Sequence, residues 1–120
     1  MTMPKLNFLV LRARDPARLS SFYAAIGLGF VRHRHGKGAE HYACESGEGV
    51  FEIYPASSDS RHTSGLRLGF AVENVQQAVA ALLEEGATLL SPPKESPWGL
   101  RAVLEDPEGH KLELTGATDR

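Results

Sequence analysis

The chain repeats its own pattern of structural elements. A strand, a helix and three further strands are predicted in the first half, and the same order returns after a linker. The two predicted helices end at Gly27 and Gly86, and the same offset aligns Phe8 with Arg67. Repetition of this kind indicates one supersecondary motif used twice. Because a half of about 60 residues buries too little apolar surface to be comfortably stable when isolated, the halves must share a core or sheet edges.

Apolar spacing and turn residues predict the individual elements. The first helix starts at an N-cap, Asp15, and the second at Asn74, with Gln77 completing a pair that resembles a capping box. The predicted strands cover residues 6–12, 30–35, 40–45 and 50–54, then 66–72, 88–91, 100–104 and 110–115. The chain is therefore predicted to be α+β, one domain over residues 1–120. It has two tandem βαβββ modules, 5–55 and 65–116, a linker over 56–64, and a sheet face of each module curving around a cleft.

The composition excludes several classes of function. The net charge is −2 with signs interspersed, so neither a nucleic-acid partner nor a charged membrane surface is expected. The longest apolar run, residues 78–83, is too short to span a bilayer, and no signal-peptide pattern opens the sequence. Cys44 is the only cysteine, which rules out an internal disulfide and a thiolate zinc site. A cytoplasmic location is expected.

The stretch SPWGLRAVLEDPEGHKLEL, residues 96–114, predicts a hairpin whose turn is Asp-Pro-Glu-Gly. In its second strand Leu112 and Leu114 face one side, and Lys111, Glu113 and Thr115 face the other. A carboxylate in mid-strand either lies on a solvated face or points into a site.

The segments DPARLSSFYAAIGLGF and WGLRAVLEDPEGHKLEL resemble the vicinal oxygen chelate superfamily, and the resemblance covers essentially the whole chain. This superfamily includes glyoxalase I, extradiol dioxygenases, fosfomycin-inactivating enzymes and bleomycin-resistance proteins. The resemblance implies paired βαβββ modules and two chains around each site, hence a homodimer. It is more specific for fold than for activity.

Metal-dependent members of the superfamily place His, Glu, His and Glu in the cleft. Carried over by position, this pattern falls on Phe8, Glu52, Arg67 and Glu113. Both carboxylates are kept and both imidazoles are lost. A guanidinium repels a cation, and a phenyl ring offers it no lone pair. We therefore expect no metal or other cofactor, and an Arg67 guanidinium bridging Glu52 and Glu113 by charge-assisted hydrogen bonds.

Three further residues are candidates for the same cleft. Tyr54 lies on a strand and could present its hydroxyl. Trp98, in the Pro-rich loop SPPKESPWG, either packs on the core or acts as a flexible lid that stacks on a ligand. Arg101 either reaches into the cleft or caps the turn.

The histidines carry a weaker signal. For His33, His35 and His41 an exposed hairpin is preferred over an adventitious metal pair, and their role is left open. His110 belongs to the turn and His62 to the linker.

Three functions remain open. The first is a metal-free binding protein that holds a small aromatic or cationic organic molecule, as antibiotic-sequestering relatives do. The alternative is a lyase of glyoxalase type or a dioxygenase of extradiol type, in which Glu52 and Glu113 would hold a divalent metal. The third is a metal-free enzyme with Glu52 or Glu113 as general base. It ranks last because Arg67 would lower the pKa of such a base.

Overall fold

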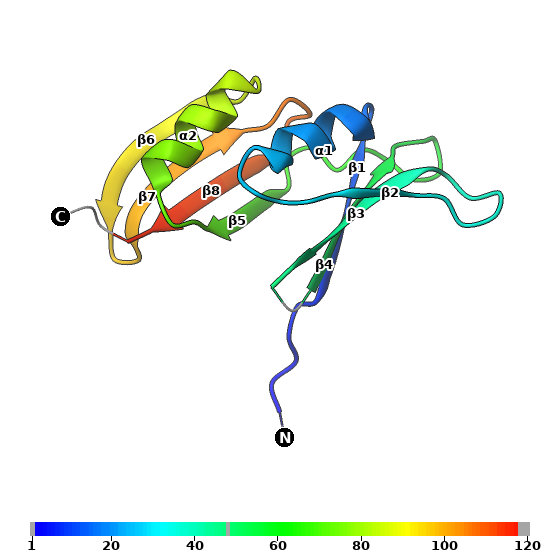
Figure 1. Ribbon diagram of the computed structural model, residues 1–120, viewed down its shortest axis with the longest axis horizontal. Helices are drawn as coiled ribbons and strands as arrows, with labels where there is room; N and C mark the ends of the chain where they lie inside the picture. The colour runs from blue at the N-terminus through cyan, green and yellow to red at the C-terminus, as the bar shows by residue number, and fades with distance from the viewer. Residues whose placement is uncertain (1, 48, 118–120) are drawn as a thin grey trace. The chain divides into compact units, whose positions relative to one another are not determined.

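The structure, a computed structural model, describes residues 2–47 and 49–117. It divides into two compact units, residues 1–62 and 63–120. Within the described residues each unit has one helix and one four-stranded mixed sheet, in the order β-α-β-β-β (Figure 1). The predicted α+β class with two βαβββ modules is confirmed. Their union into a single domain around a cleft stays a prediction.

The first unit contains β1 (Phe8–Ala13), α1 (Pro16–Ala24), β2 (Val31–His33), β3 (His41–Ser46) and β4 (Gly49–Pro55). Its sheet has the strand order β1-β4-β3-β2, with β1 parallel to β4 and the other pairs antiparallel. Helix α1 packs on one sheet face. The core there is built from buried apolar side chains of the helix and of β1 and β4: Leu11, Leu19, Phe22, Tyr23, Phe51 and Ile53.

The second unit contains β5 (Arg67–Ala71), α2 (Val75–Glu84), β6 (Thr88–Ser96), β7 (Gly99–Glu105) and β8 (Lys111–Gly116). Its strand order is β5-β8-β7-β6, with β5 parallel to β8. Helix α2 covers one face of this sheet. The core between helix and sheet is built from Val75, Val79 and Leu82 of α2 and from Leu68, Leu104, Leu112 and Leu114 of the strands.

Both helices begin as the sequence predicts. The Asp15 carboxylate accepts a hydrogen bond from the Arg18 backbone N–H at 3.1 Å, and the Asn74 side chain accepts one from Gln77 N–H at 2.9 Å. Each helix is followed by a glycine at positive φ, Gly27 in the first unit and Gly86 in the second. The N-cap and the closing glycine therefore set each helix locally.

Strand β6 is the main departure from the predicted elements. The prediction ends this strand at Ser91 because Pro92 and Pro93 read as loop residues, but β6 continues to Ser96. Prolines are tolerated on an edge strand, since only one side of the strand must supply hydrogen bonds to a neighbour. Strand β6 is such an edge, and its register with β7 shifts between Leu89 and Ser91 and again across the prolines, between Ser91 and Lys94.

Alternation along β8 leaves one face of the second sheet free of the helix. Leu112 and Leu114 are buried, whereas Lys111, Glu113 and Thr115 are only partly covered. Because cross-strand partners share a face, Gly69 on β5 and Val103 on β7 lie on the same face as Glu113. This open face therefore gathers residues from three strands around Glu113.

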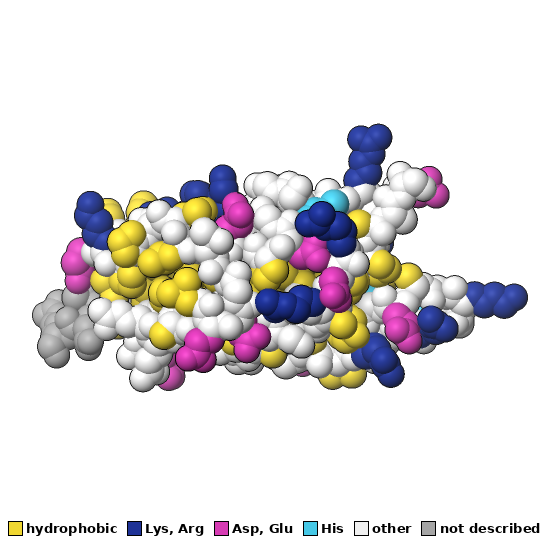
Figure 2. All heavy atoms as spheres, turned by 90° about the horizontal axis from the view of Figure 1, so that it is seen from above, with side chains coloured by type: hydrophobic (Ala, Val, Ile, Leu, Met, Phe, Trp, Pro, Cys, Tyr) yellow, Lys and Arg dark blue, Asp and Glu magenta, His cyan; other side chains and the backbone are white. Residues whose placement is uncertain are grey.

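The charged side chains do not form a single-sign surface on the face in view in Figure 2, where basic and acidic groups alternate. Among the described residues, no helix combines the length and apolar character needed to cross a bilayer.

Candidate functional site

An arginine–carboxylate cluster occupies the open face of the second sheet. Arg101 Nη2 lies 2.6 Å from Glu113 Oε1, and Arg101 Nε donates to Oε2 at 3.3 Å. Arg67 Nη1 donates to Glu113 Oε1 at 2.8 Å. The Glu113 half of the bridge expected for Arg67 is therefore present, and its Glu52 half stays a prediction. Of the two roles left open for Arg101, the structure shows the one on this face: its planar fork holds both oxygens of the carboxylate.

The two guanidinium groups keep Glu113 ionised. Hydrogen bonding from Arg101 is the main cause that lowers the pKa of Glu113, aided by the charges of Arg101 and Arg67, while partial burial acts in the opposite direction. The same hydrogen bond raises the pKa of Arg101. Glu113 therefore stays an acceptor at neutral pH and is poorly suited to act as a general base.

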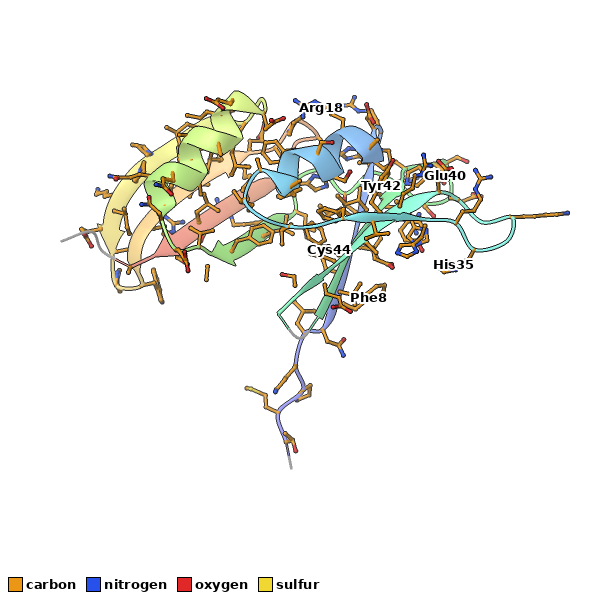
Figure 3. The ribbon with its side chains drawn as sticks, viewed as in Figure 1. Phe8, Arg18, His35, Glu40, Tyr42 and Cys44 are labelled. Atoms are coloured by element: carbon orange, nitrogen blue, oxygen red, sulfur yellow. The ribbon has the colours of Figure 1, made fainter. Side chains whose placement is uncertain are left out.

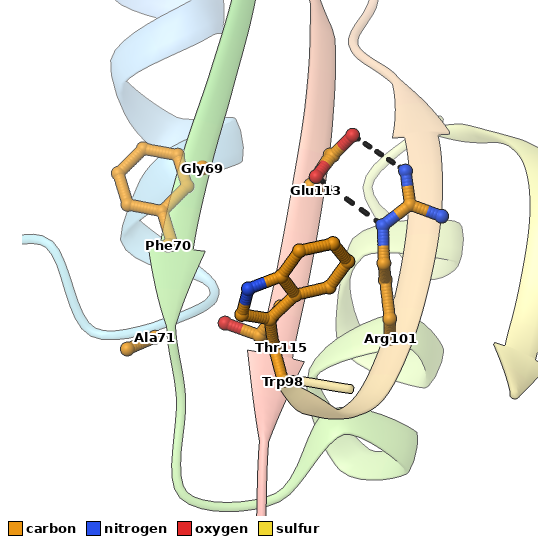
Figure 4. Close-up of a pocket in the computed structure, with 7 residues that line it drawn as sticks. All are labelled: Gly69, Phe70, Ala71, Trp98, Arg101, Glu113 and Thr115. Carbon is orange, nitrogen blue, oxygen red and sulfur yellow. Dashed lines mark hydrogen bonds and ion pairs between the residues drawn. The ribbon is translucent and has the colours of Figure 1, made fainter. Parts of the chain in front are cut away.

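A pocket of about 390 Å³ opens beside this cluster (Figure 4). Its lining comes from β5, the β6–β7 turn, β7 and β8: Gly69, Phe70, Ala71, Trp98, Arg101, Glu113 and Thr115. The Trp98 side chain, residues of β5 and one charged pair make a mostly apolar wall with a few polar groups. This is the usual character of a small-molecule site, and the volume lies within the usual range.

Trp98 stands at the tip of a tight hairpin rather than on a long loop. Ser96 pairs with Gly99 in the register of β6 and β7, so only Pro97 and Trp98 form the turn. The Ser96 hydroxyl donates to the Gly99 carbonyl at 2.7 Å and accepts from the Trp98 N–H at 3.2 Å. The indole is 74% exposed although its backbone is tied down. The alternative of a loop packed on the core is therefore wrong, and the alternative that Trp98 stacks on a ligand stays a prediction. Trp98 is an exposed ring on a short, hydrogen-bonded turn.

The other sequence-predicted residues lie in the first unit. Phe8, near the start of β1, is 54% exposed, and so is not a core residue (Figure 3). Glu52 on β4 shares the open face of that sheet, since it pairs with Val10 and Ala43. The Tyr54 ring stacks on His41 with 4.1 Å between centroids and has the Arg12 guanidinium 4.7 Å from its centroid. Whether these residues and the Glu113 cluster serve one ligand stays a prediction.

The imidazole rings of His33, His35 and His41 lie close together, which the sequence did not predict. Neighbouring imidazole centroids are 5.4 to 6.0 Å apart. His41 is buried at 2% exposure, with Nε2 3.9 Å from Glu52 Oε2, so its predicted exposure is wrong. His33 and His35 are exposed, as predicted. Nearby, a second hollow of about 450 Å³ is lined by Gly29, Val31, His33, Ala43, Cys44, Glu45 and Val50.

A buried polar network in the second unit was also missed. His110 is fully buried, with Nδ1 2.9 Å from Asp106 Oδ2 and Nε2 2.7 Å from the Thr63 hydroxyl. Because a carboxylate only accepts hydrogen bonds, Nδ1 is the donor to Asp106. Asp106 Oδ1 also accepts from the backbone N–H groups of Glu108 and His110. The network ties the β7–β8 turn to the start of the unit. It resembles a catalytic triad only in residue types, since none of its members lines either pocket described above.

The divalent metal of the superfamily's enzymes does not fit these residues. Both oxygens of Glu113 accept hydrogen bonds from guanidinium groups, and Arg67, at a position where the family resemblance implies a ligand, carries a positive charge. Phe8 supplies no lone pair. Across the part of the chain that the structure describes, no group of three or more His, Cys, Asp or Glu side chains is arranged to hold a metal ion.

Comparison with known families decides the membership of this chain. Residues 8–115 match the model of the glyoxalase-like domain, which is nearly the whole sequence. The chain belongs to the glyoxalase-like family. The resemblance to the vicinal oxygen chelate superfamily drawn from the sequence motifs is thereby confirmed. Among curated proteins, no sequence matches this glyoxalase-like chain.

Solved structures support the fold of this glyoxalase-like protein. An antibiotic binding protein from a Streptomyces species has a TM-score of 0.77 at 20% identity, covering 98% of this chain and 99% of that one. A glyoxalase/bleomycin resistance protein from Albidiferax ferrireducens has a TM-score of 0.70 at 25% identity, covering 91% and 95%. A glyoxalase/bleomycin resistance protein/dioxygenase family enzyme from Burkholderia phytofirmans has a TM-score of 0.73 at 24% identity, covering 92% and 97%.

Proposed function

We propose that this glyoxalase-like protein binds a small planar organic molecule in the pocket beside Trp98, without a metal ion and without altering the molecule. The observation that carries this proposal is the pairing of Glu113 with two arginines next to an aromatic-lined pocket of about 390 Å³. A carboxylate held in this way is neither a free metal ligand nor an effective base. The pocket then offers recognition but no evident group to perform a reaction.

The likeness to an antibiotic binding protein supports binding as the activity. Holding a drug without changing it would protect a cell by sequestration, and this is the form of function that we propose for the chain. Phe8, Glu52 and Tyr54, on the open face of the first sheet, are proposed as further ligand contacts. A homodimer, which the sequence resemblance implies, likewise stays a proposal.

Protein purified without chelators is expected to contain well below one nickel, zinc, manganese or iron ion per chain, because two guanidinium groups occupy the carboxylate. Elemental analysis of the folded protein measures this, with the Glu113→Gln variant as the matched control. An ion present at one per chain in the parent and absent from Glu113→Gln would instead support a metal-dependent lyase or dioxygenase.

Replacing Trp98 with alanine is expected to weaken binding of a planar probe, naphthalene-2-carboxamide, by about tenfold, because the ring loses its stacking partner. The Trp98→Phe variant should retain most of the affinity. Isothermal titration calorimetry measures both variants without relying on tryptophan emission. Leu90, also exposed, is absent from the pocket lining, so Leu90→Ala is the control for loss of apolar surface. Equal affinity of Trp98→Ala and parent protein would exclude the indole as a binding wall.

A further inference from the structure

The charges beside the second-unit pocket do not balance. Arg67 and Arg101 carry two positive charges, and Glu113 supplies one negative charge. Along the same face, Lys111 and Glu105 are cross-strand neighbours of opposite sign, and Lys94 on β6, the cross-strand partner of Arg101, adds a further positive charge. The cluster of Arg67, Arg101 and Glu113, of which Arg101 and Glu113 line the pocket, therefore has a surplus of one positive charge.

That surplus resides on a side chain with unused donors. A guanidinium has five N–H donors in a planar fork. Among the described residues, Arg67 donates one hydrogen bond, from Nη1 to Glu113, and its side chain is 52% exposed. Arg101, by contrast, uses two of its nitrogens on the carboxylate. Arg67 does not itself line the pocket, but it is bonded to the lining residue Glu113 and is the neighbouring cation whose other donors are not used on the bidentate pair.

A positively charged ligand is disfavoured at this pocket. A cationic ligand would have to compete with both arginines for Glu113, since each carboxylate oxygen already accepts a charge-assisted hydrogen bond. It would also approach a region of net positive charge. An anionic ligand meets neither cost, and a carboxylate or sulfonate matches the geometry of the guanidinium fork.

We propose that the pocket selects planar aromatic anions, with the acidic group of the ligand paired to Arg67 and its ring against Trp98. This inference rests on the proposed function and specifies the ligand class. Where the sequence left an aromatic or a cationic ligand open, the charges around Glu113 favour an aromatic ligand of negative charge.

Three probes of one shape separate charge from stacking: naphthalene-2-carboxylate, naphthalene-2-carboxamide and 2-(aminomethyl)naphthalene. Trp98 is the only tryptophan in the chain, so one indole N–H signal in the proton–nitrogen NMR spectrum reports on the pocket without assignment. The carboxylate is expected to bind about tenfold more tightly than the amide, as one charge-assisted hydrogen bond provides, and the amine most weakly.

Variants then test the assignment to Arg67. Arg67→Gln should lower the affinity for the carboxylate to that for the amide and leave the amide unchanged. Arg34→Gln is the matched control, because Arg34 is a similarly exposed arginine, 60% against 52%, also paired with one glutamate, but in the first unit. It removes the same charge from the chain and should change neither affinity.

The outcomes distinguish failure of this inference from failure of the proposed binding function on which it rests. Equal binding of carboxylate and amide, or tightest binding of the amine, would overturn the choice of an anion and leave a binding function in place. If Arg34→Gln loses as much affinity for the carboxylate as Arg67→Gln does, the net charge of the chain explains the loss. That result would overturn the role of Arg67. If no probe moves the indole signal at millimolar concentration, the binding function itself fails.

Discussion

Replacing Asp106 with alanine is expected to lower the free energy of unfolding by about 4 kcal/mol, a loss that few single substitutions exceed. Three hydrogen bonds would be removed: two from backbone N–H groups of the β7–β8 turn and one from the His110 ring. Asp106, Glu108 and His110 are all buried, so the N–H groups that lose their acceptor could not form hydrogen bonds with water instead. Each buried donor left unpaired costs about 1–3 kcal/mol. Urea denaturation followed by circular dichroism measures the loss.

Two variants make the Asp106 result interpretable. Asp59→Ala removes an exposed carboxylate and should change stability by no more than about 0.5 kcal/mol. If Asp106→Ala fails to fold, Thr63→Val provides a smaller step at the other end of the network. It removes the hydroxyl bonded to His110 Nε2 and should cost about 1 kcal/mol. Stability of Asp106→Ala equal to that of Asp59→Ala would show that this network does not stabilise the unit.

The fold was predictable because its signals are local. Asp15 and Asn74 each cap a helix through a backbone N–H three residues ahead, and such a pattern is complete within a few positions. Apolar alternation in the strands requires no knowledge of the partner strand. The error at residues 92–96 arose because proline excludes a central strand but not an edge strand, and the strand order was unknown.

The Glu113 site was predictable only in part. The alternation of Leu112 and Leu114 with Glu113 placed the carboxylate on the open face, and the family resemblance placed Arg67 next to it. The contribution of Arg101 depends on the register of β7 against β8, which sets Arg101 opposite Thr115 and one diagonal step from Glu113. No periodicity within one strand reports that register.

The buried histidines could not be found from sequence. His110 contacts Thr63 across 47 residues, and each of the two lies in a stretch whose polar residues read as turn or linker. His41 was assigned to an exposed hairpin, whereas the Tyr54 ring lies directly against it. A polar side chain is buried only when its partners are supplied by the fold, so its burial is a property of tertiary structure.

Replacing Gly69 with valine is expected to abolish binding of naphthalene-2-carboxylate while leaving the protein folded. Gly69 lines the pocket and is the cross-strand partner of Glu113, and a Cβ added there meets no atom within 4 Å, so the new side chain has open space on the pocket side. Valine also suits a strand better than glycine, and stability should rise by about 0.5–1 kcal/mol. Titration of the Trp98 indole signal together with urea denaturation measures both effects.

The same substitution at Gly29 is the matched control for this experiment. Gly29 lines the hollow of the first unit, and a Cβ added there is likewise free of contacts within 4 Å. If the ligand occupies the Trp98 pocket, Gly29→Val should bind naphthalene-2-carboxylate as the parent does, and Gly69→Val should not. The reverse result would move the ligand to the hollow beside His33 and Cys44. Because both variants add the same isopropyl group, a difference between them reports where the ligand lies, not a general effect of greater apolar surface.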